Sequence, residues 1–333
     1  MAPSLSKRLK RTLRYGLIRA ALALVGLLPL RAAQALGRAL GKAAFHLAPG
    51  ERRKALATLS VAFPEMTDEV RLELVRRCFR HLGTVALEMA VAPRLGARLE
   101  RLVDMSGVAL TRLQEAHARG KGVVCVTAHL GNWELHGARV ARHGFPLSVV
   151  GKENVDPRLT RLMERSRGDG GMRTLWRGQP GVAVSMLRAL RKGELLGMLI
   201  DQDTNVQNVF VPFFGRPAAT PRAAADLVLR TGAAALVFLN HRGDDGVYRT
   251  TTEEVEVPRT GDDEHDAVEL TARMTQRIEA AIRAHPDQCW KREEPHRHPQ
   301  RPSMVWSSIA GASRPTARGG HGWPPRCARS SGR

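Results

Sequence analysis

The sequence is poor in cysteine and in aromatic residues. Its four cysteines among 333 residues, Cys78, Cys125, Cys289 and Cys327, show no CxxC spacing. A long chain with so few and scattered thiols does not depend on disulfide bonds, so we expect its body on the cytosolic side of a membrane. Aromatic residues make up only 5% of the chain. This composition disfavours a nucleic-acid surface, in which aromatic side chains alternate with basic ones.

Acidic residues are missing from both ends of the chain. Residues 1–50 contain nine lysines and arginines, and residues 300–333 contain six arginines, with no aspartate or glutamate in either segment. These two segments carry most of the net charge of +20. A nucleic-acid enzyme more often carries its basic stripe on the folded body. We therefore expect no nucleic-acid partner.

The apolar run at the N-terminus is too short for a straight membrane-spanning helix. Residues 15–30 provide about 16 positions where ~20 are needed, and Arg19 interrupts them. Five basic residues between Lys7 and Arg14 precede the run. Three interpretations remain open: a retained anchor on anionic lipid, a buried amphipathic helix, or a signal peptide with a cleavage site near residues 33–35. We favour the anchor, over residues 1–50, with its cations facing anionic lipid on the cytoplasmic side of a membrane.

The remaining pattern predicts an α/β fold. Residues 51–95 read as helices, broken at Pro64 and started again by an N-cap at Thr67. From residue 122 onward, short apolar runs alternate with helical stretches, which predicts a largely parallel central sheet flanked by helices. The expected strands are 122–127, 147–151, 172–176, 195–200 and 233–240, followed by a hairpin strand and a closing helix at 265–284. We assign the catalytic domain to residues 51–290 and a basic, disordered tail to 291–333.

One motif contains candidate catalytic residues. The strand at 122–127 runs directly into AHLGNWELHG, residues 128–137. His129 is expected on the turn between a strand end and a helix start, where α/β proteins place functional groups. Glu134 falls in the first helical turn, from which a carboxylate could fix the imidazole tautomer and stabilise the imidazolium. A purely structural histidine is the alternative interpretation.

The chain lacks the usual signatures of a nucleophile and of a metal site. No serine or cysteine stands in a GxSxG context, so the pair would activate a hydroxyl of the substrate without an acyl-enzyme. His129, Glu134, His136 and His143 lie close in sequence, but the HExxH spacing is missing. Histidines at this spacing cannot converge on one metal from a single helix. We expect neither a metal nor a cofactor.

The motif resembles the H-x4-D/E block of the lysophospholipid acyltransferase superfamily, and specifically its lipid A late acyltransferase (lauroyl/myristoyl transferase) branch. Further segments are similar in the same order, from about residue 8 to about residue 290. They include LATLSVAFPEMTDEVRLELVRRCFRHLG, ALRKGELLGMLIDQD, VFVPFFGRPAATP and TGAAALVFLNHR. The resemblance implies catalysis by His129 and Glu134. It also implies a fatty acyl thioester donor, usually acyl carrier protein, and a phosphorylated glucosamine-disaccharide lipid as the acceptor.

The resemblance extends to further candidate site residues. Arg177 matches the arginine of the superfamily's second block, which is expected to meet acceptor phosphate through its forked donors. Arg167 could assist it, or could simply be a cation at a helix C-terminus. Asp201 and Asp203 follow a strand, a position that suits either catalysis or a local turn. Asn132, within the motif, is a further site-lining candidate.

A dense apolar patch, VPFFG, contains Phe213, Phe214 and Gly215. It could line an acyl-chain groove or belong to the core. The end of the chain departs from the family pattern, because an aperiodic Arg-, Pro- and Ser-rich segment follows HPDQ at 285–288. A frameshift would account for this ending. Two alternatives stay open: an acyltransferase acting on another membrane lipid, such as a glycolipid mannoside or a lysophospholipid, and a catalytically inactive membrane-binding homologue.

Overall fold

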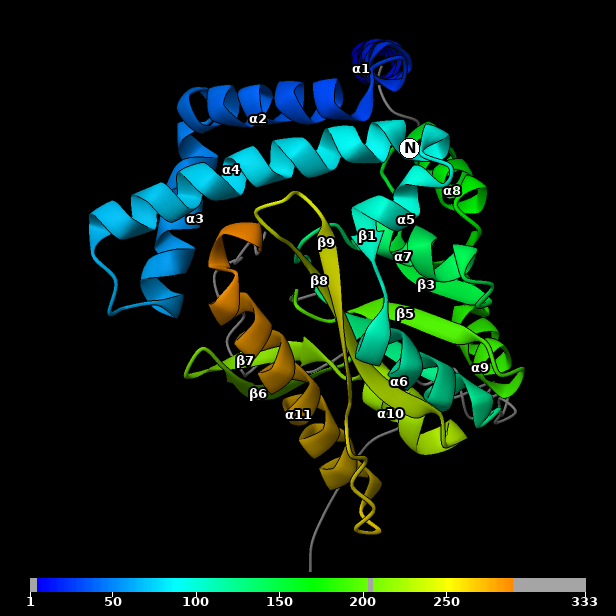
Figure 1. Cartoon of the computed structure of the whole chain (residues 1–333). Helices are drawn as coiled ribbons and strands as arrows, with labels where there is room; N and C mark the ends of the chain where they lie inside the picture. Colours follow the sequence, from blue (N-terminus) through cyan, green and yellow to red (C-terminus); the bar gives the residue numbers. More distant parts are fainter. Residues whose placement is uncertain (1–4, 203–205, 290–333) are drawn as a thin grey trace, which may run out of the picture.

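The structure is a computed structural model, and it describes residues 5–202 and 206–289. A seven-stranded sheet lies at its centre, in the order β1-β9-β8-β2-β5-β3-β4 (Figure 1). Its strands are β1 (Val103–Asp104), β2 (Val123–Thr127), β3 (Leu147–Lys152), β4 (Met172–Arg177), β5 (Leu195–Leu199), β8 (Ala234–Arg242) and β9 (Tyr248–Glu254). All neighbouring strands are parallel except β8 and β9. The predicted largely parallel α/β sheet is confirmed.

Helices cover both faces of this sheet. Alternate side chains of β2 point to opposite faces, so that Val124 and Val126 belong to one buried cluster and Val123 and Cys125 to the other. The first cluster is completed by α9 (Val182–Arg191), α10 (Ala223–Thr231) and α11 (Asp263–Ala284), and the second by α5 (Arg98–Leu102), α6 (Gly107–Ala118) and α7 (Trp133–Arg142). A strand buried on both faces reads as a continuous apolar run, which explains why β2 was visible in the sequence.

Four further helices at the N-terminal end of the chain form a layer of their own. They are α1 (Leu5–Gly26), α2 (Leu30–Leu47), α3 (Pro49–Ala62) and α4 (Asp68–Val91), and α4 starts at the predicted N-cap, Thr67. α2 and α4 run side by side (Figure 1) with their backbones in contact. A Cβ atom on Gly83 would lie 2.1 Å from the carbonyl oxygen of Gly37, and one on Gly41 would lie 2.2 Å from that of Phe79. Only glycine permits so close an approach.

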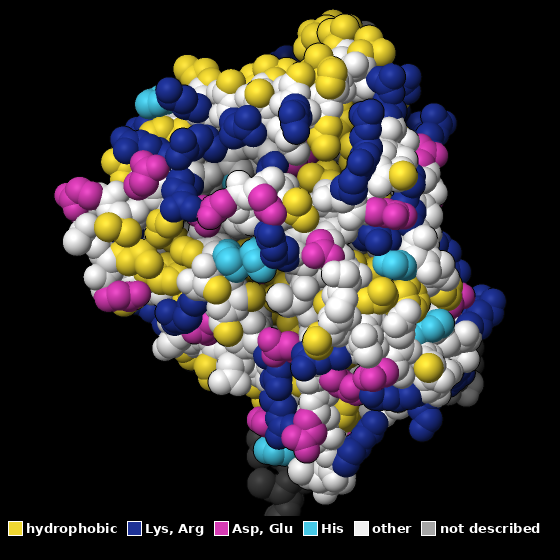
Figure 2. All heavy atoms as spheres, in the orientation of Figure 1, with side chains coloured by type: hydrophobic (Ala, Val, Ile, Leu, Met, Phe, Trp, Pro, Cys, Tyr) yellow, Lys and Arg dark blue, Asp and Glu magenta, His cyan; other side chains and the backbone are white. Residues whose placement is uncertain are grey.

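The N-terminal layer carries an exposed apolar edge. Leu9, Leu13 and Leu17 of α1 are spaced four residues apart and therefore share one face of the helix. Figure 2 shows hydrophobic side chains gathered along the edge formed by α1 and α2, with Lys and Arg side chains directly beneath. The exposed leucines are Leu9, Leu13, Leu17, Leu24, Leu27, Leu36, Leu40 and Leu47. Within residues 5–202 and 206–289, no helix combines the length and apolar character needed to cross a membrane.

Several elements were not expected from the sequence, among them the helices α5 and α6. β6 (Asn208–Phe213) and β7 (Arg216–Pro221) form a separate antiparallel hairpin, and β1 joins the sheet edge through only two residues. The hairpin lies beside α11 (Figure 1). The predicted tail at 291–333 lies outside the described residues.

Candidate active site

His129 and Asp201 meet at the carboxyl-terminal edge of the sheet. β2 and β5 are parallel neighbours whose last residues, Thr127 and Leu199, pair with each other. Each of the two site residues stands two positions beyond its strand end, so the register brings them together. Asp201 Oδ1 lies 2.9 Å from Nδ1 of the His129 ring, and its Oδ2 accepts a 2.8 Å hydrogen bond from the His129 backbone N–H. The His129–Asp201 pair is therefore held at both backbone and ring.

This geometry determines the state of the imidazole. The Asp201 side chain is fully buried, whereas the His129 side chain is 20% exposed. Because an ionised carboxylate only accepts hydrogen bonds, Nδ1 carries the proton and Nε2 presents its lone pair. The Trp133 ring packs against the imidazole at a centroid distance of 4.7 Å. A histidine oriented in this way is suited to take a proton through Nε2.

Glu134 has a different partner from the one predicted. Its carboxylate, in the first turn of α7, is held by both Nε and Nη2 of Arg167, at 3.0 and 2.6 Å. The expected pairing of Glu134 with the His129 ring was wrong, because Asp201 occupies Nδ1. The reason is the strand order, which places β5 next to β2 and brings Asp201 to the ring. Arg167 belongs to α8 (Pro157–Asp169), and this buried residue leaves Nη1 without a hydrogen-bond partner among the described residues.

Cations gather at the ends of β3 and β4. Lys152 and Arg177 are the last residues of these strands and stand opposite each other in the register. Within the described chain neither has an acidic partner, and burial lowers the pKa of Arg177 below its usual value. Arg167 lies close by, with its guanidinium 5.9 Å from the Trp176 ring. An arginine that is half-buried without an acid can bind an anionic group of a ligand.

A mostly apolar cavity opens beside this charged cluster. Trp133 and Glu134, which are partly exposed, line it together with Arg167. Its remaining walls come from β2, β3, β5, β8, α7 and Met172 at the start of β4, and they include Leu147, Met172 and Phe238. His136 also lines the cavity and stacks on Phe238 at 4.2 Å, and burial lowers its pKa to about 3. The walls away from Glu134 and Arg167 are therefore uncharged at neutral pH.

The other predicted site residues lie elsewhere. Phe213 is buried in the core, and Phe214 packs on it and on Phe63. Neither they nor Gly215 line the cavity, because they belong to the β6–β7 hairpin. Asn132 is fully buried and caps α7 by accepting the Leu135 N–H. Asp203 lies outside the described residues.

Two of the three thiols in the described part of the chain are buried. Burial raises the pKa of both Cys78 and Cys125 to about 12. A thiol with such a pKa stays protonated and unreactive at neutral pH.

Sequence reasoning did not single out Trp133 or Lys152. Trp133 stands inside the motif, so its contact with the ring could have been anticipated from position alone. Lys152 ends a predicted strand next to the one that ends in Arg177, and only the pairing of β3 with β4 shows that they are neighbours.

Comparison with known proteins points to one family of acyltransferases. Residues 4–290 match the family model described as bacterial lipid A biosynthesis acyltransferase. A lipid A biosynthesis acyltransferase of Haemophilus influenzae is 25% identical over 274 residues, which cover 80% of this chain and 82% of the relative. A lipid A biosynthesis palmitoleoyltransferase of Escherichia coli is 31% identical over 251 residues, covering 72% and 76%.

A third relative acts on a different lipid by its name. A phosphatidylinositol mannoside acyltransferase of Mycobacterium tuberculosis is 27% identical over 197 residues, covering 57% of this chain and 60% of the relative. All three relatives are named acyltransferases, and the family model spans the whole sheet and both halves of the site. The chain is an acyltransferase and belongs to the bacterial lipid A biosynthesis acyltransferase family.

Proposed function

We propose that this acyltransferase moves a fatty acyl chain from an acyl thioester, carried by acyl carrier protein, to a hydroxyl of a lipid A precursor. The observation that carries the proposal is the His129–Asp201 pair beside an apolar cavity, in which no described residue hydrogen-bonds to Nε2 of the imidazole. A base next to an apolar cavity suits the transfer of a long hydrocarbon chain to a hydroxyl.

The reaction proceeds in one covalent transfer. Nε2 of His129 takes the proton of the acceptor hydroxyl while its oxygen attacks the thioester carbonyl carbon. The tetrahedral intermediate collapses with cleavage of the carbon–sulfur bond. The leaving thiolate receives the proton from the imidazolium, so the histidine returns to its starting state. Asp201 stabilises the imidazolium in between, because its buried carboxylate lies 2.9 Å from Nδ1.

Glu134 contributes through Arg167 in this scheme. The two-bond ion pair holds the guanidinium in one orientation, and its third nitrogen has no hydrogen-bond partner among the described residues. Arg177 and Lys152 form a cationic rim beside the buried Arg167 guanidinium, and we assign this rim to an acceptor phosphate. Arginine suits this role because its planar fork matches two phosphate oxygens. Removing Glu134 would release Arg167 and leave its buried charge unbalanced.

The apolar cavity provides a seat for the acyl chain. It starts at Trp133, whose ring touches His129, and continues between buried apolar residues such as Leu147 and Met172. A thioester carbonyl near Nε2 would thus have its hydrocarbon chain directed toward the interior. Burial of each methylene contributes about 0.8 kcal/mol, so the part of the chain inside the cavity adds to the binding energy.

The N-terminal layer provides the attachment to the membrane. Leu9, Leu13 and Leu17 share the exposed face of α1, and arginines and lysines flank them. An amphipathic helix of this kind lies in the plane of a bilayer surface, and its cations favour anionic lipid. We assign the cytoplasmic face of the inner membrane, where the acceptor lipid would be within reach.

Mass spectrometry of lipid A tests the proposal. Lipid A from cells that carry the gene should contain a species heavier by one acyl chain than lipid A from cells in which the gene is deleted. Identical spectra from the two strains would refute the assignment of lipid A as acceptor.

A second acceptor is favoured by one comparison. The phosphatidylinositol mannoside acyltransferase relative aligns over 57% of this chain. A glycolipid mannoside also carries a phosphate and a sugar hydroxyl, so the cationic rim fits it. Offering both lipids to the purified protein, with the same thioester donor, separates the two acceptors.

A further inference from the structure

The turn that follows His129 makes hydrogen bonds to residues from several other parts of the chain. The Gly131 N–H donates to the Gln288 carbonyl, and the Gly131 carbonyl lies 3.1 Å from Nε2 of His81. Burial lowers the pKa of His81 to about 4, so its ring is neutral and Nε2 donates as an N–H. The Asn132 backbone makes two hydrogen bonds with the Asn240 side chain: its N–H donates to Oδ1 at 3.0 Å, and its carbonyl accepts from Nδ2 at 3.3 Å. The backbone between the two site residues His129 and Glu134 is therefore fixed from several elements.

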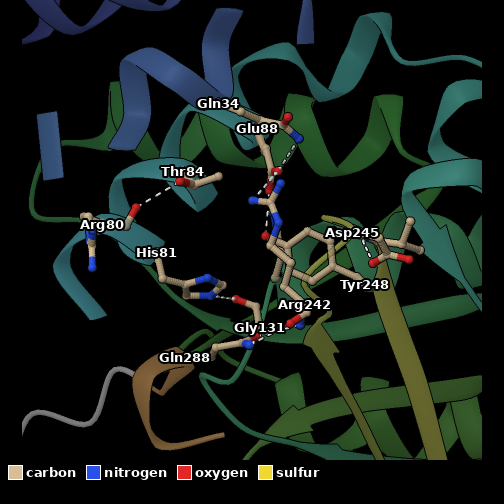
Figure 3. Close-up of polar contacts among 12 residues, drawn as sticks. Gln34, Arg80, His81, Thr84, Glu88, Gly131, Arg242, Asp245, Tyr248 and Gln288 are labelled. Atoms are coloured by element: carbon tan, nitrogen blue, oxygen red, sulfur yellow. Dashed lines mark hydrogen bonds and ion pairs between the residues drawn. The ribbon is translucent and has the colours of Figure 1, made fainter. Parts of the chain in front are cut away.

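The Asn132 side chain is anchored by a buried carboxylate. Glu88, on α4, is completely inaccessible to solvent, and its Oε2 accepts hydrogen bonds from Asn132 Nδ2 at 3.1 Å and from the Tyr248 hydroxyl at 2.7 Å. Its Oε1 accepts one from Gln34 Nε2 at 2.8 Å and lies 3.2 Å from Nη1 of Arg242. Figure 3 shows Gln34, Arg242 and Tyr248 directed toward this carboxylate. Four groups from α2, the start of α7, β8 and β9 thus converge on one side chain.

All four partners are donors, so the site requires a carboxylate. Burial, together with the charge of Glu88, raises the pKa of Tyr248 well above its usual value, and the hydroxyl keeps its proton. Arg242 supplies the compensating positive charge. An amide in place of the carboxylate would turn an N–H group toward the Asn132 N–H₂, which leaves unpaired groups in a dry environment.

Stability alone does not explain a buried ion pair. Well-packed apolar residues of similar size are often as stabilising or more so, because the desolvation of both charges is costly. We propose that Glu88 is a positioning residue: by fixing Asn132 it holds the turn that carries His129 and Glu134 in the geometry needed for acyl transfer. The inference rests on the proposed function, and it adds a residue that the site itself does not contain.

The Glu88 carboxylate also connects the turn after His129 to the N-terminal layer. Gln34 belongs to α2, whose exposed side carries Leu36 and Leu40. α2 and α4 touch through the backbones of Gly37 and Gly83, so the two helices are closely packed. The Gln34–Glu88–Asn132 chain of hydrogen bonds therefore links α2 to the turn that follows His129.

Exchanging the carboxylate and the amide between positions 88 and 132 tests the inference. Glu88→Gln disrupts the hydrogen bond to Asn132, and Asn132→Asp places two carboxylates side by side. In the double variant, the new amide at position 88 can donate to the new carboxylate at position 132 and to the Tyr248 hydroxyl, which can act as an acceptor. The amide oxygen at position 88 keeps the hydrogen bonds from Gln34 and Arg242. The matched control is Glu73→Gln, an exposed glutamate on the same helix.

Two readouts separate positioning from mere stability. The first is kcat and KM with an acyl carrier protein thioester and a phosphorylated lipid A precursor. We expect kcat to fall by about 10²-fold in each single variant, as misplacement of reacting groups does, with KM for the thioester changed less than about threefold. The double variant should recover most of the loss. The control should match wild type.

The second readout does not depend on any reaction. Hydrogen exchange of the amides at 129–136 should speed up in Glu88→Gln and return toward wild type in the double variant. If Glu88→Gln is too unstable to purify, Tyr248→Phe removes one donor from Oε2 and should give a smaller change in the same direction. Unchanged kcat and unchanged exchange, with only a lower melting temperature, would overturn the inference. A wild-type protein that transfers no acyl group, yet shows the exchange pattern, would instead refute the proposed function.

Discussion

His129 and Asp201 are hydrogen-bonded across the ends of two neighbouring parallel strands, although 72 positions separate them in the sequence. This bond makes Nδ1 the protonated nitrogen of the ring. Asp201→Asn would offer an amide in place of the carboxylate and favour the wrong tautomer. We predict a fall in kcat of about 10⁴-fold, with little change in the folded structure.

The measurement is a steady-state assay with circular dichroism as the check on folding. The double variant with His129→Ala should be little worse than His129→Ala alone, because residues that act as a unit are not additive. Full additivity of the two losses would show that Asp201 acts independently of the ring.

Arg177→Ala should impair the use of phosphorylated acceptor more than it impairs hydrolysis of the thioester by water. The half-buried guanidinium has no acidic partner in the described structure and is free to bind phosphate. Loss of one charged hydrogen-bonding group corresponds to roughly 1.5–3 kcal/mol, or about 10- to 150-fold in kcat/KM. With dephosphorylated acceptor, the kcat/KM values of wild type and variant should differ far less. An undiminished preference of the variant for phosphorylated acceptor would remove the phosphate role.

Gly137→Ala should shift acyl preference toward shorter chains. A Cβ atom at this position would lie 2.6 Å from the Met172 sulfur, so the Met172 side chain must move into the cavity space. Competition between thioesters of different acyl chain length, analysed by mass spectrometry of the product, gives the profile. Gly168→Ala is the matched control, because a Cβ there would meet nothing within 4 Å. The same shift in both variants would exclude the cavity as the chain seat.

Replacement of Leu9, Leu13 and Leu17 with serine should release the protein from membranes. The three side chains are 62–72% exposed on one face of α1, and each buried leucine contributes about 1.5–3 kcal/mol. We expect wild type to sediment with anionic vesicles and the triple variant to stay largely in solution. Salt at about 1 M should extract wild type only if the cations dominate, because the screening length falls to ~3 Å. Equal sedimentation of both proteins would contradict the lipid-facing assignment.

The sheet could be predicted because its central strands are buried on both faces. Runs such as GVVCVT and LLGMLI have no polar alternation, and their lengths suit strands. The β6–β7 hairpin was missed because Pro212, Pro217 and Pro221 lie within or at the end of its strands, and proline argues against a strand. β1 was missed because two residues carry no pattern, and only its pairing with β9 defines it.

The site was predictable where it is local and not where it depends on strand order. His129 and Glu134 belong to one motif, and their positions at a strand end and in a first helical turn were foreseen. Their partners come from elements distant in sequence, since Asp201 follows β5 and Arg167 lies in α8. The sequence shows that these elements exist, but not that β5 lies between β2 and β3. Glu88 was hidden for the same reason, because α4 reads as an ordinary amphipathic helix.

The central claim is that His129 takes the proton from the acceptor hydroxyl. The most direct test is the rate of acyl transfer by His129→Ala, with an acyl carrier protein thioester and a phosphorylated lipid A precursor as substrates. The account predicts a loss of ~10²–10⁴-fold in kcat, with unchanged thermal unfolding and unchanged vesicle binding. A variant that keeps more than about a tenth of the wild-type rate would contradict it, because a general base contributes at least ~10²-fold.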